Sequence, residues 1–219
     1  MGTVLGELLP LAVGVAISPI PIVAAILMLL SARAGSTGTG FATGWVVGIL
    51  VVTVLVVLLS GSIDTDAGPS RSAAVAWVKI VLGILLVLLA AKQWRDRADT
   101  DIPGWMQAID RMTFVKATGL GVVLSAVNPK NLLLCVSAGM GIGTGGLAAG
   151  GRAVAVVVFT VLAACTVLVP VIGYALAADR LRGTLDELKS WLQTNNHAVM
   201  AVVLLVMGAV VAGKGIAGL

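Results

Sequence analysis

The sequence predicts an all-α membrane protein of six transmembrane helices, built as two inverted three-helix repeats with broken helices one and four. The first observation is composition: 59% of the 219 residues are hydrophobic, 11% are charged, and the mean hydropathy is +1.09. Soluble domains are about 45–50% apolar and about 25% charged. The other two observations are six long apolar runs and a pair of proline-containing breaks. The whole chain, residues 1–219, is expected to form one transmembrane domain.

Each apolar run is about 18–26 residues long, which is enough to cross the hydrocarbon core of a bilayer. We expect a first repeat over residues 1–92, a cytoplasmic connector with an amphipathic helix over 93–116, and a second repeat over 117–219. The six runs are Leu5–Leu30, Phe41–Leu59, Ala74–Lys92, Ala117–Ala138, Ala153–Ala178 and Ala198–Ile216.

The first run contains Ser18-Pro19-Ile20-Pro21. A residue that precedes proline is pushed out of the helical region, so the first half-helix should end near Ile17 or Ser18. A second half-helix can begin at Pro19 or Pro21, because the first turn of a helix does not use the missing N–H. A simple proline kink without function is the alternative.

Gly38-Thr39-Gly40 precedes the second run, and Gly44 and Gly48 lie within it. Their small-xxx-small spacing predicts close helix packing and no chemistry.

The fourth run contains Ser125-Ala126-Val127-Asn128-Pro129-Lys130-Asn131. Pro129 removes a backbone donor and interrupts the helix. An ammonium group such as that of Lys130 costs roughly 3 kcal/mol or more at the centre of a membrane, and ionisable residues placed there are usually functional.

The two breaks resemble each other in sequence. Gly14-Val15 and Ser18 in the first half match Gly121-Val122 and Ser125 in the second, and a proline follows in both. Each half has an odd number of spans, so the halves have opposite orientations. Transporters with this pattern bind substrate where the broken helices of the two halves meet.

A half-helix that begins inside the membrane presents N–H groups that favour an anion, and Lys130 lies beside such a start. We therefore predict an anionic substrate near Lys130. The alternative is that Lys130 pairs with free carbonyl groups of the first break and locks the halves together. The candidate substrate-binding residues are Lys130, Asn128, Pro129, Asn131, Ser18, Pro19, Pro21 and Ser125.

Two connecting segments are predicted to carry amphipathic helices. The segment 103–112 places Trp105, Ile109 and Met112 on one face, which suits a membrane interface or the cytoplasmic face of the protein. Between runs five and six, Thr184 and Glu187 have the spacing of a capping box. One face of the same segment is an apolar stripe that runs from Leu181 to Leu192.

The distribution of basic residues predicts the orientation. The loops after runs one, three and five carry nine Lys and Arg residues, and the opposite side carries four. The positive-inside rule then places both termini outside the plasma membrane. The nine are Arg33, Lys92, Arg95, Arg97, Arg111, Lys116, Arg180, Arg182 and Lys189; the four are Arg71, Lys79, Arg152 and Lys214.

Several function classes are disfavoured. Cys135 and Cys165 do not form a Cys-x-x-Cys pair, and the single His197 cannot build a metal site alone, so neither a cofactor nor a metal is expected. No nucleophile–base pair or Walker loop indicates an enzyme. Glu7, near the outer end of run one, is the only carboxylate close to a run interior, which disfavours a cation exporter. The basic loops follow the membrane topology and do not indicate nucleic-acid binding.

A family resemblance rests on Pro103–Thr113, on Gly119-Leu120-Gly121, on Ser125–Leu134 and on the Ser-Pro-x-Pro of run one. These segments resemble the glycolipid-addressing proteins of mycobacteria, a family within the lysine-exporter superfamily. The resemblance implies a six-span plasma-membrane protein, often dimeric, that helps a glycolipid such as a sulfolipid or glycopeptidolipid reach the cell surface. The Asn-Pro-Lys of that family falls on Asn128, Pro129 and Lys130, whereas the first break lacks an Asn.

Three functions remain open. The first is a transporter, or transport accessory, for an anionic glycolipid. The second is an exporter of a small solute, such as an amino acid or an ion. The third is a scaffold that docks a larger lipid-export machinery. A groove open to the bilayer would favour the first function, a closed polar cavity the second, and an exposed apolar patch on the connecting helices the third.

Overall fold

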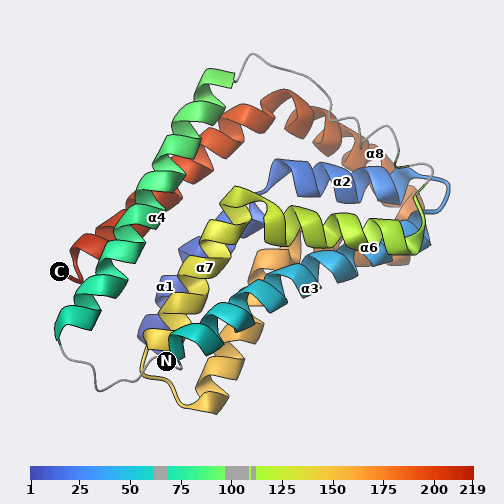
Figure 1. Cartoon of the computed structure of the whole chain (residues 1–219). Coiled ribbons are helices and arrows are strands. Elements are labelled where there is room, and N and C mark those ends of the chain that lie inside the picture. The colour runs from blue at the N-terminus through green and yellow to red at the C-terminus, as the bar shows by residue number, and fades with distance from the viewer. Residues whose placement is uncertain (62–68, 97–108, 110–111) are drawn as a thin grey trace.

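The computed structural model describes residues 1–61, 69–96, 109 and 112–219, and the elements in these parts of the chain are helical (Figure 1). The elements are α1 (Gly2–Ala16), α2 (Pro19–Leu30), α3 (Ala34–Gly61), α4 (Pro69–Arg95), α6 (Phe114–Val122), η3 (Val123–Val127), α7 (Pro129–Thr144) and α8 (Ala149–Ile216). The all-α prediction is confirmed for these residues. The predicted amphipathic helix around Trp105 lies outside the described residues.

Within these parts of the chain, four helical segments are long and apolar enough to cross a membrane. They are Ala34–Ser60, Val75–Arg95, Ala149–Ala178 and Arg180–Ile216. Two bent helix pairs also qualify, which gives up to six crossings if each pair is one span. The structure therefore agrees with a multi-pass membrane protein.

Both predicted breaks are present. α1 and α2 meet at 55°, and the helix formed by α6 and η3 meets α7 at 65°. Ser18 adopts an extended conformation with φ −120° and ψ 96°, and Pro19 is the first residue of α2. Proline likewise begins α7, at Pro129. In both places the proline occupies the first helical position, where its missing N–H is not needed.

The segment between the last two spans differs from the prediction. Residues Arg180–Ile216 form one helix, so Thr184 lies in a helix interior and cannot be the N-cap of a separate surface helix. An N-cap residue needs a non-helical conformation, and in α8 only Ala177 has one, with φ −151° and ψ 52°. The apolar stripe packs inward in part, because Leu185 and Leu192 are buried.

Glycines hold α3 directly against α6, as the small-xxx-small spacing predicts. A Cβ atom on Gly40 would lie 2.7 Å from the carbonyl oxygen of Phe114. A Cβ on Gly44 would collide with the backbone of Thr118, and one on Gly48 with the side chain of Ser125. This glycine seam brings the backbones of the two helices together, and no larger residue fits in it.

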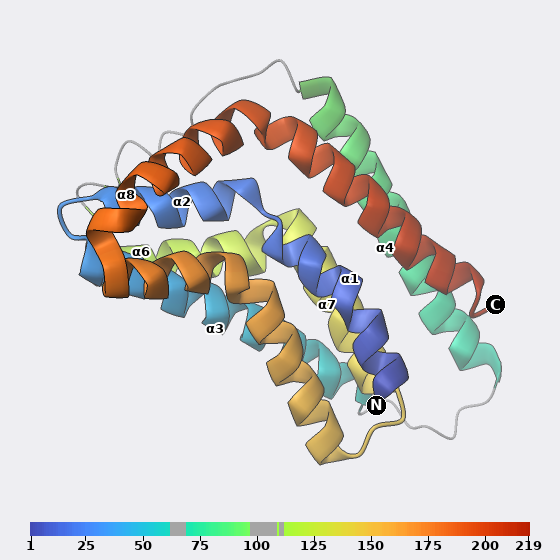
Figure 2. The ribbon, with the colours of Figure 1, turned by 180° about the vertical axis from the view of Figure 1, so that it is seen from behind.

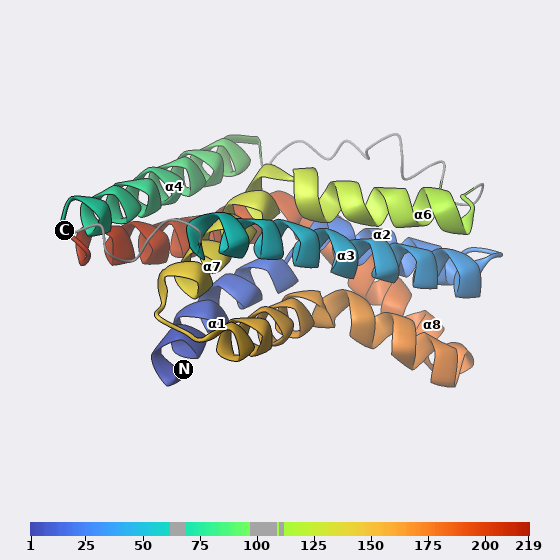
Figure 3. The same ribbon diagram turned by 60° about the horizontal axis from the view of Figure 1, so that its bottom comes forward.

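A second close packing joins α4 to the last part of α8, and the two helices run side by side in all three views (Figures 1, 2 and 3). A Cβ on Gly208 would lie 2.9 Å from the carbonyl oxygen of Gly83, and one on Gly215 would lie 2.7 Å from that of Ala76. We call this helix pair, α4 with residues 180–216 of α8, the α4–α8 arm.

Tryptophans are placed partly as an aromatic belt requires. Trp77, Trp94 and Trp191 are exposed, as side chains at the edges of a membrane should be. Trp45 is fully buried and stacks on Phe41 with ring centroids 6.3 Å apart, so it belongs to the core.

The two chain termini lie at the same end of the molecule. Glu7, near the start of α1, contacts Lys214, near the end of α8. An even number of crossings produces this arrangement.

Candidate functional site

The two breaks meet through Lys130. Its Nζ atom donates to the carbonyl oxygen of Ile17 at 2.7 Å and to the Ser18 hydroxyl at 2.8 Å. The residue is only 2% exposed. Lys130 therefore joins the start of α7 to the gap between α1 and α2, which is the contact expected if the lysine locks the two halves together. Its role in binding a substrate stays a prediction.

The position of Lys130 follows the electrostatics of a helix end. Ile17 is the C-cap of α1, where carbonyl groups lack partners inside the helix and carry partial negative charge. The ammonium lies against this negative end. Its partners are a carbonyl and a hydroxyl, both neutral, and no carboxylate of the described residues is among them.

Ser18 connects three groups at the first break. Its Oγ atom lies 2.6 Å from the carbonyl oxygen of Val15 and 3.1 Å from Oδ1 of Asn131. A hydroxyl has one proton, so it donates to one of these oxygens while it accepts from Lys130. Ser18 and Asn131, both predicted site residues, are thus brought together with Lys130 and are buried.

Thr166 of α8 supplies a further donor to the first break, and it is not among the site residues predicted from the sequence. Its hydroxyl donates to the carbonyl oxygen of Ala16 at 2.7 Å. A threonine inside an apolar span usually bonds to a carbonyl of its own helix, so nothing in the sequence distinguished this residue from the other threonines of the spans.

At the second break, Asn131 supplies a hydrogen bond to a backbone carbonyl that lacks a partner in its own helix. Residues Val123–Val127 form a π-helix, in which each carbonyl pairs with the N–H five residues later. The carbonyl of Leu124 would need the N–H of residue 129, which proline lacks. The side-chain amide of Asn131 donates to this carbonyl instead, at 3.0 Å.

Asn128, Pro129, Pro19 and Pro21 shape the two helix starts. Asn128 is the N-cap of α7, and its Oδ1 accepts the backbone N–H of Lys130 at 3.1 Å. Pro19 and Pro21 remove two of the first three N–H groups of α2. Neither helix start therefore presents the row of free N–H groups that an anion site at a helix N-terminus uses.

Ser125 does not join this cluster. Its hydroxyl bonds within its own helix, where the carbonyl oxygens of Gly121 and Val122 lie 2.8 Å and 3.1 Å away, and its side chain lies against Gly48. The structure places it in the glycine seam between α3 and the helix formed by α6 and η3, where its role is packing.

In a comparison with protein families, the family described as Sap, sulfolipid-1-addressing protein, matches residues 8–217. The chain belongs to this family. The match spans nearly the whole chain, and it confirms the resemblance to glycolipid-addressing proteins. No curated protein and no solved structure matches the chain.

An apolar groove lies on the α4–α8 arm, away from Lys130. It has a volume of about 360 Å³, within the size range of small-molecule pockets. Trp94 lines it and is exposed, so the groove lies at the surface of the arm. Its lining is Val87, Ala90, Ala91, Trp94, Ala201, Val202 and Leu205. In a member of the Sap family, a surface of this kind is suited to contact with lipid chains.

Proposed function

We propose that this member of the Sap family moves an anionic glycolipid across or out of the plasma membrane, as the transporter itself or as an accessory of a larger export machinery. The observation that carries the proposal is Lys130, a buried lysine at the point where two broken helices meet, whose hydrogen-bond partners among the described residues are neutral oxygens. The family supports a lipid as the ligand.

The hydrogen-bond partners of Lys130 can be replaced by an anionic ligand. Its ammonium binds the carbonyl of Ile17 and the hydroxyl of Ser18, neither of which carries a full charge. Hydrogen bonds to an ionised acceptor are about twice as strong as neutral ones. A sulfate or phosphate ester would therefore replace these partners if the halves separated enough to admit it. In this scheme Lys130 locks the empty protein and binds the head group of the loaded one.

The apolar groove on the α4–α8 arm suits the acyl chains of the same lipid. Its lining is almost entirely apolar, and it belongs to helices that are long and apolar enough to cross the membrane. A lipid can then keep its chains in the bilayer and on this arm while its head group passes through the protein.

The inverted repeat and the orientation are part of the proposal. Similar bends of 55° and 65° in the two halves support a repeat of three spans. The nine-to-four bias of basic residues supports termini that face outward. A C-terminal tag after Leu219 should then be accessible to an antibody on intact cells, and a tag reached only after permeabilisation would contradict this orientation.

Lipid analysis of the cell surface tests the function. A deletion strain should lack one anionic glycolipid at its surface and accumulate it inside. Wild-type protein should restore the lipid, and Lys130→Ala should not. Lys189→Ala is the matched control, because Lys189 forms an exposed ion pair with Asp186 far along α8. Immunoblots must show equal amounts of each variant in the membrane.

A small-solute exporter would use the same lysine differently. The enclosed polar cluster of Lys130, Ser18 and Asn131 favours this second candidate. It predicts an unchanged surface lipid profile in the deletion strain and an intracellular rise of a soluble anion or amino acid. Normal surface lipids in both the deletion strain and the Lys130→Ala strain would overturn the lipid proposal.

A further inference from the structure

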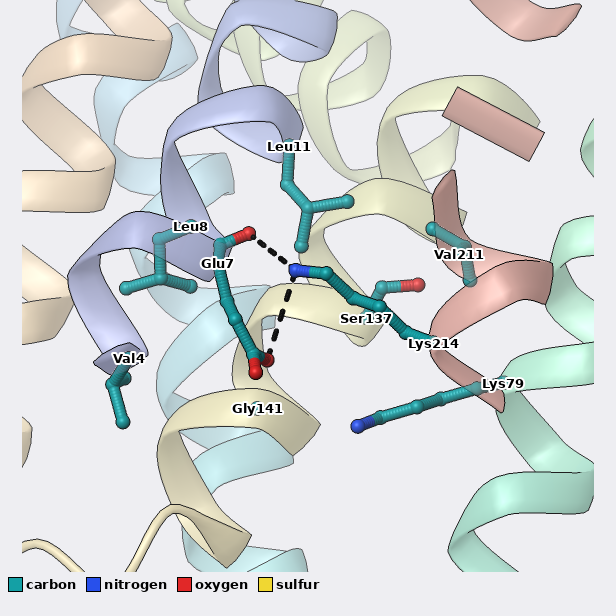
Figure 4. Close-up of a pocket in the computed structure, with 9 residues that line it drawn as sticks. All are labelled: Val4, Glu7, Leu8, Leu11, Lys79, Ser137, Gly141, Val211 and Lys214. Carbon is teal, nitrogen blue, oxygen red and sulfur yellow. Dashed lines mark hydrogen bonds and ion pairs between the residues drawn. The ribbon is translucent and has the colours of Figure 1, made fainter. Parts of the chain in front are cut away.

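A second polar site lies at the end of the molecule that carries both termini, apart from Lys130. A small pocket opens there between α1, α4, α7 and the end of α8, and Figure 4 shows its side chains. It is lined by Val4, Glu7, Leu8, Leu11, Lys79, Ser137, Gly141, Val211 and Lys214. Three charged side chains from three helices therefore converge in one pocket whose remaining lining is mostly apolar.

One of the two lysines is already partnered. Lys214 donates to the backbone carbonyl of Glu7 at 3.1 Å, and its Nζ lies 3.7 Å from a carboxylate oxygen of the same residue. The dashed lines in Figure 4 mark both contacts. The carboxylate of Glu7 thus balances one positive charge.

Lys79 is the other lysine, and it has no hydrogen bond or ion pair with any described residue. Figure 4 shows the side chain of Lys79 extending from α4 toward the carboxylate of Glu7. Two ammonium groups and one carboxylate leave an excess of one positive charge. A partly buried charge beside apolar side chains needs a counter-charge, so the pocket is suited to an anion.

The size and surroundings of the pocket restrict that anion. The volume of about 20 Å³ holds one water molecule or one oxygen atom of a larger group. The rest of the group must remain at the mouth of the pocket. Around Lys79, the side chains of Trp77, Val78 and Val81 are exposed, and on a spanning helix such side chains contact lipid. An anion attached to a lipid would reach this mouth from the membrane.

We propose that this pocket binds a sulfate or phosphate ester on the head group of a membrane lipid, with one ester oxygen between the ammonium groups of Lys79 and Lys214. The inference rests on the proposed function only in taking a lipid as the ligand, because Lys130 is not part of this pocket. If that end faces outward, the pocket is a place for the head group on the outer side of the membrane.

Binding measurements on the purified full-length protein in detergent micelles test this site. The probes are a sulfated galactosylceramide, the same lipid without sulfate, and inorganic sulfate, and native mass spectrometry measures occupancy. We expect the sulfated lipid to bind at least about tenfold more tightly than the uncharged lipid, because one charge-assisted contact accounts for such a factor. Inorganic sulfate should bind more weakly than the sulfated lipid.

Lys79→Gln is the decisive variant, because it removes the unpaired ammonium and breaks no hydrogen bond or ion pair of the described residues. It should weaken binding of the sulfated lipid about tenfold and leave binding of the uncharged lipid unchanged. Lys79→Arg should retain most of the affinity. Lys189→Gln removes one positive charge elsewhere on the protein and should change nothing.

Three results would overturn the inference. They are equal affinity of wild type and Lys79→Gln for the sulfated lipid, equal binding of sulfated and uncharged lipid, and inorganic sulfate that binds as tightly as the lipid. Either of the first two results would mean that Glu7, Lys79 and Lys214 have a structural role and bind no lipid. The third result would mean that the pocket binds a free anion instead of a lipid head group. Lys130→Gln should keep this binding even if it abolishes export, so failure here and failure of the proposed function are distinguishable.

Discussion

The two broken helices contain similar sequences but have different chemistry. The break between α1 and α2 exposes carbonyl groups and receives its donors from other helices, namely Lys130 of α7 and Thr166 of α8. The break before α7 is satisfied close by, because Asn128 caps the new helix and Asn131 bonds the carbonyl of Leu124. The first break therefore depends on donors from α7 and α8, whereas the second break is satisfied by its own residues and also supplies Lys130 to the first.

This difference shows how two breaks of similar sequence can produce a single site. Two identical breaks would each expose the same unpaired groups and could not satisfy each other. Here a neutral break of carbonyls and a hydroxyl faces a break that carries an ammonium and an amide. The first break has neither Asn nor Lys, whereas the second has Asn128, Lys130 and Asn131, and this difference is visible in the sequence. Three substitutions test how much each break depends on the other.

Asn131→Leu should have the largest effect, because Asn131 contacts both breaks. The change leaves the carbonyl of Leu124 without a donor and removes an oxygen next to Ser18. An unsatisfied buried group costs about 1–3 kcal/mol, so we expect a loss of unfolding free energy of about 2 kcal/mol. Unfolding in mixed detergent micelles measures it. Asn195→Leu is the control, since the amide of the half-buried Asn195 donates to the carbonyl of Trp191 in its own helix and its loss should cost far less.

Asn128→Ala should come next, and it tests the local satisfaction of the second break alone. It removes the side chain that accepts the N–H of Lys130 at the start of α7. Loss of an N-cap costs about 0.5–2 kcal/mol, and the same unfolding assay measures the change. Asn128→Ser keeps a capping oxygen and should recover most of the stability. An equal loss for both substitutions would show that the cap is not what stabilises this helix start.

Thr166→Val should have the smallest effect, and it tests the dependence of the first break on α8. The carbonyl of Ala16 would lose the threonine and keep the N–H of Ser18 at 2.9 Å. Side-chain hydrogen bonds in membrane proteins average about 0.6 kcal/mol, so we expect a loss of that order.

Thr160→Val on the same helix is the matched control, because the buried hydroxyl of Thr160 has no partner among the described residues. This control should be neutral or slightly stabilising. If both threonine variants lost the same stability, the bond from Thr166 to the first break would contribute nothing.

The sequence was sufficient to predict the two breaks and the close packing of α3. Proline has one local effect wherever it occurs in a helix, and Gly40, Gly44 and Gly48 repeat at a fixed spacing. Helix breaks and glycine seams are set by residues close together in the sequence, so a local pattern is enough to predict them. The direction in which Lys130 points depends on tertiary structure, and the sequence left two alternatives open for it.

Other features required the fold itself. Thr166 lies far along the chain from Ala16, and only the packing of α8 against α1 brings them together. The spacing of Thr184 and Glu187 matched a capping box, but the helix continues through it because an N-cap needs a preceding bend, and the bend is at Ala177. The pocket of Glu7, Lys79 and Lys214 combines both ends of the chain, a combination that no local pattern predicts.

The glycine contacts of the α4–α8 arm have a mechanical consequence. α4 and α8 touch at the backbone at Gly83, Gly208 and Gly215, and we expect a helix pair in such contact to behave as one rigid rod. Lys79 and Lys214 are both carried on that rod, while Glu7 is carried on α1. Any swing of the rod about Ala177 would keep the two ammonium groups together and pull them away from the carboxylate. The net positive charge exposed at this end of the protein would then increase as the rod swings away from α1.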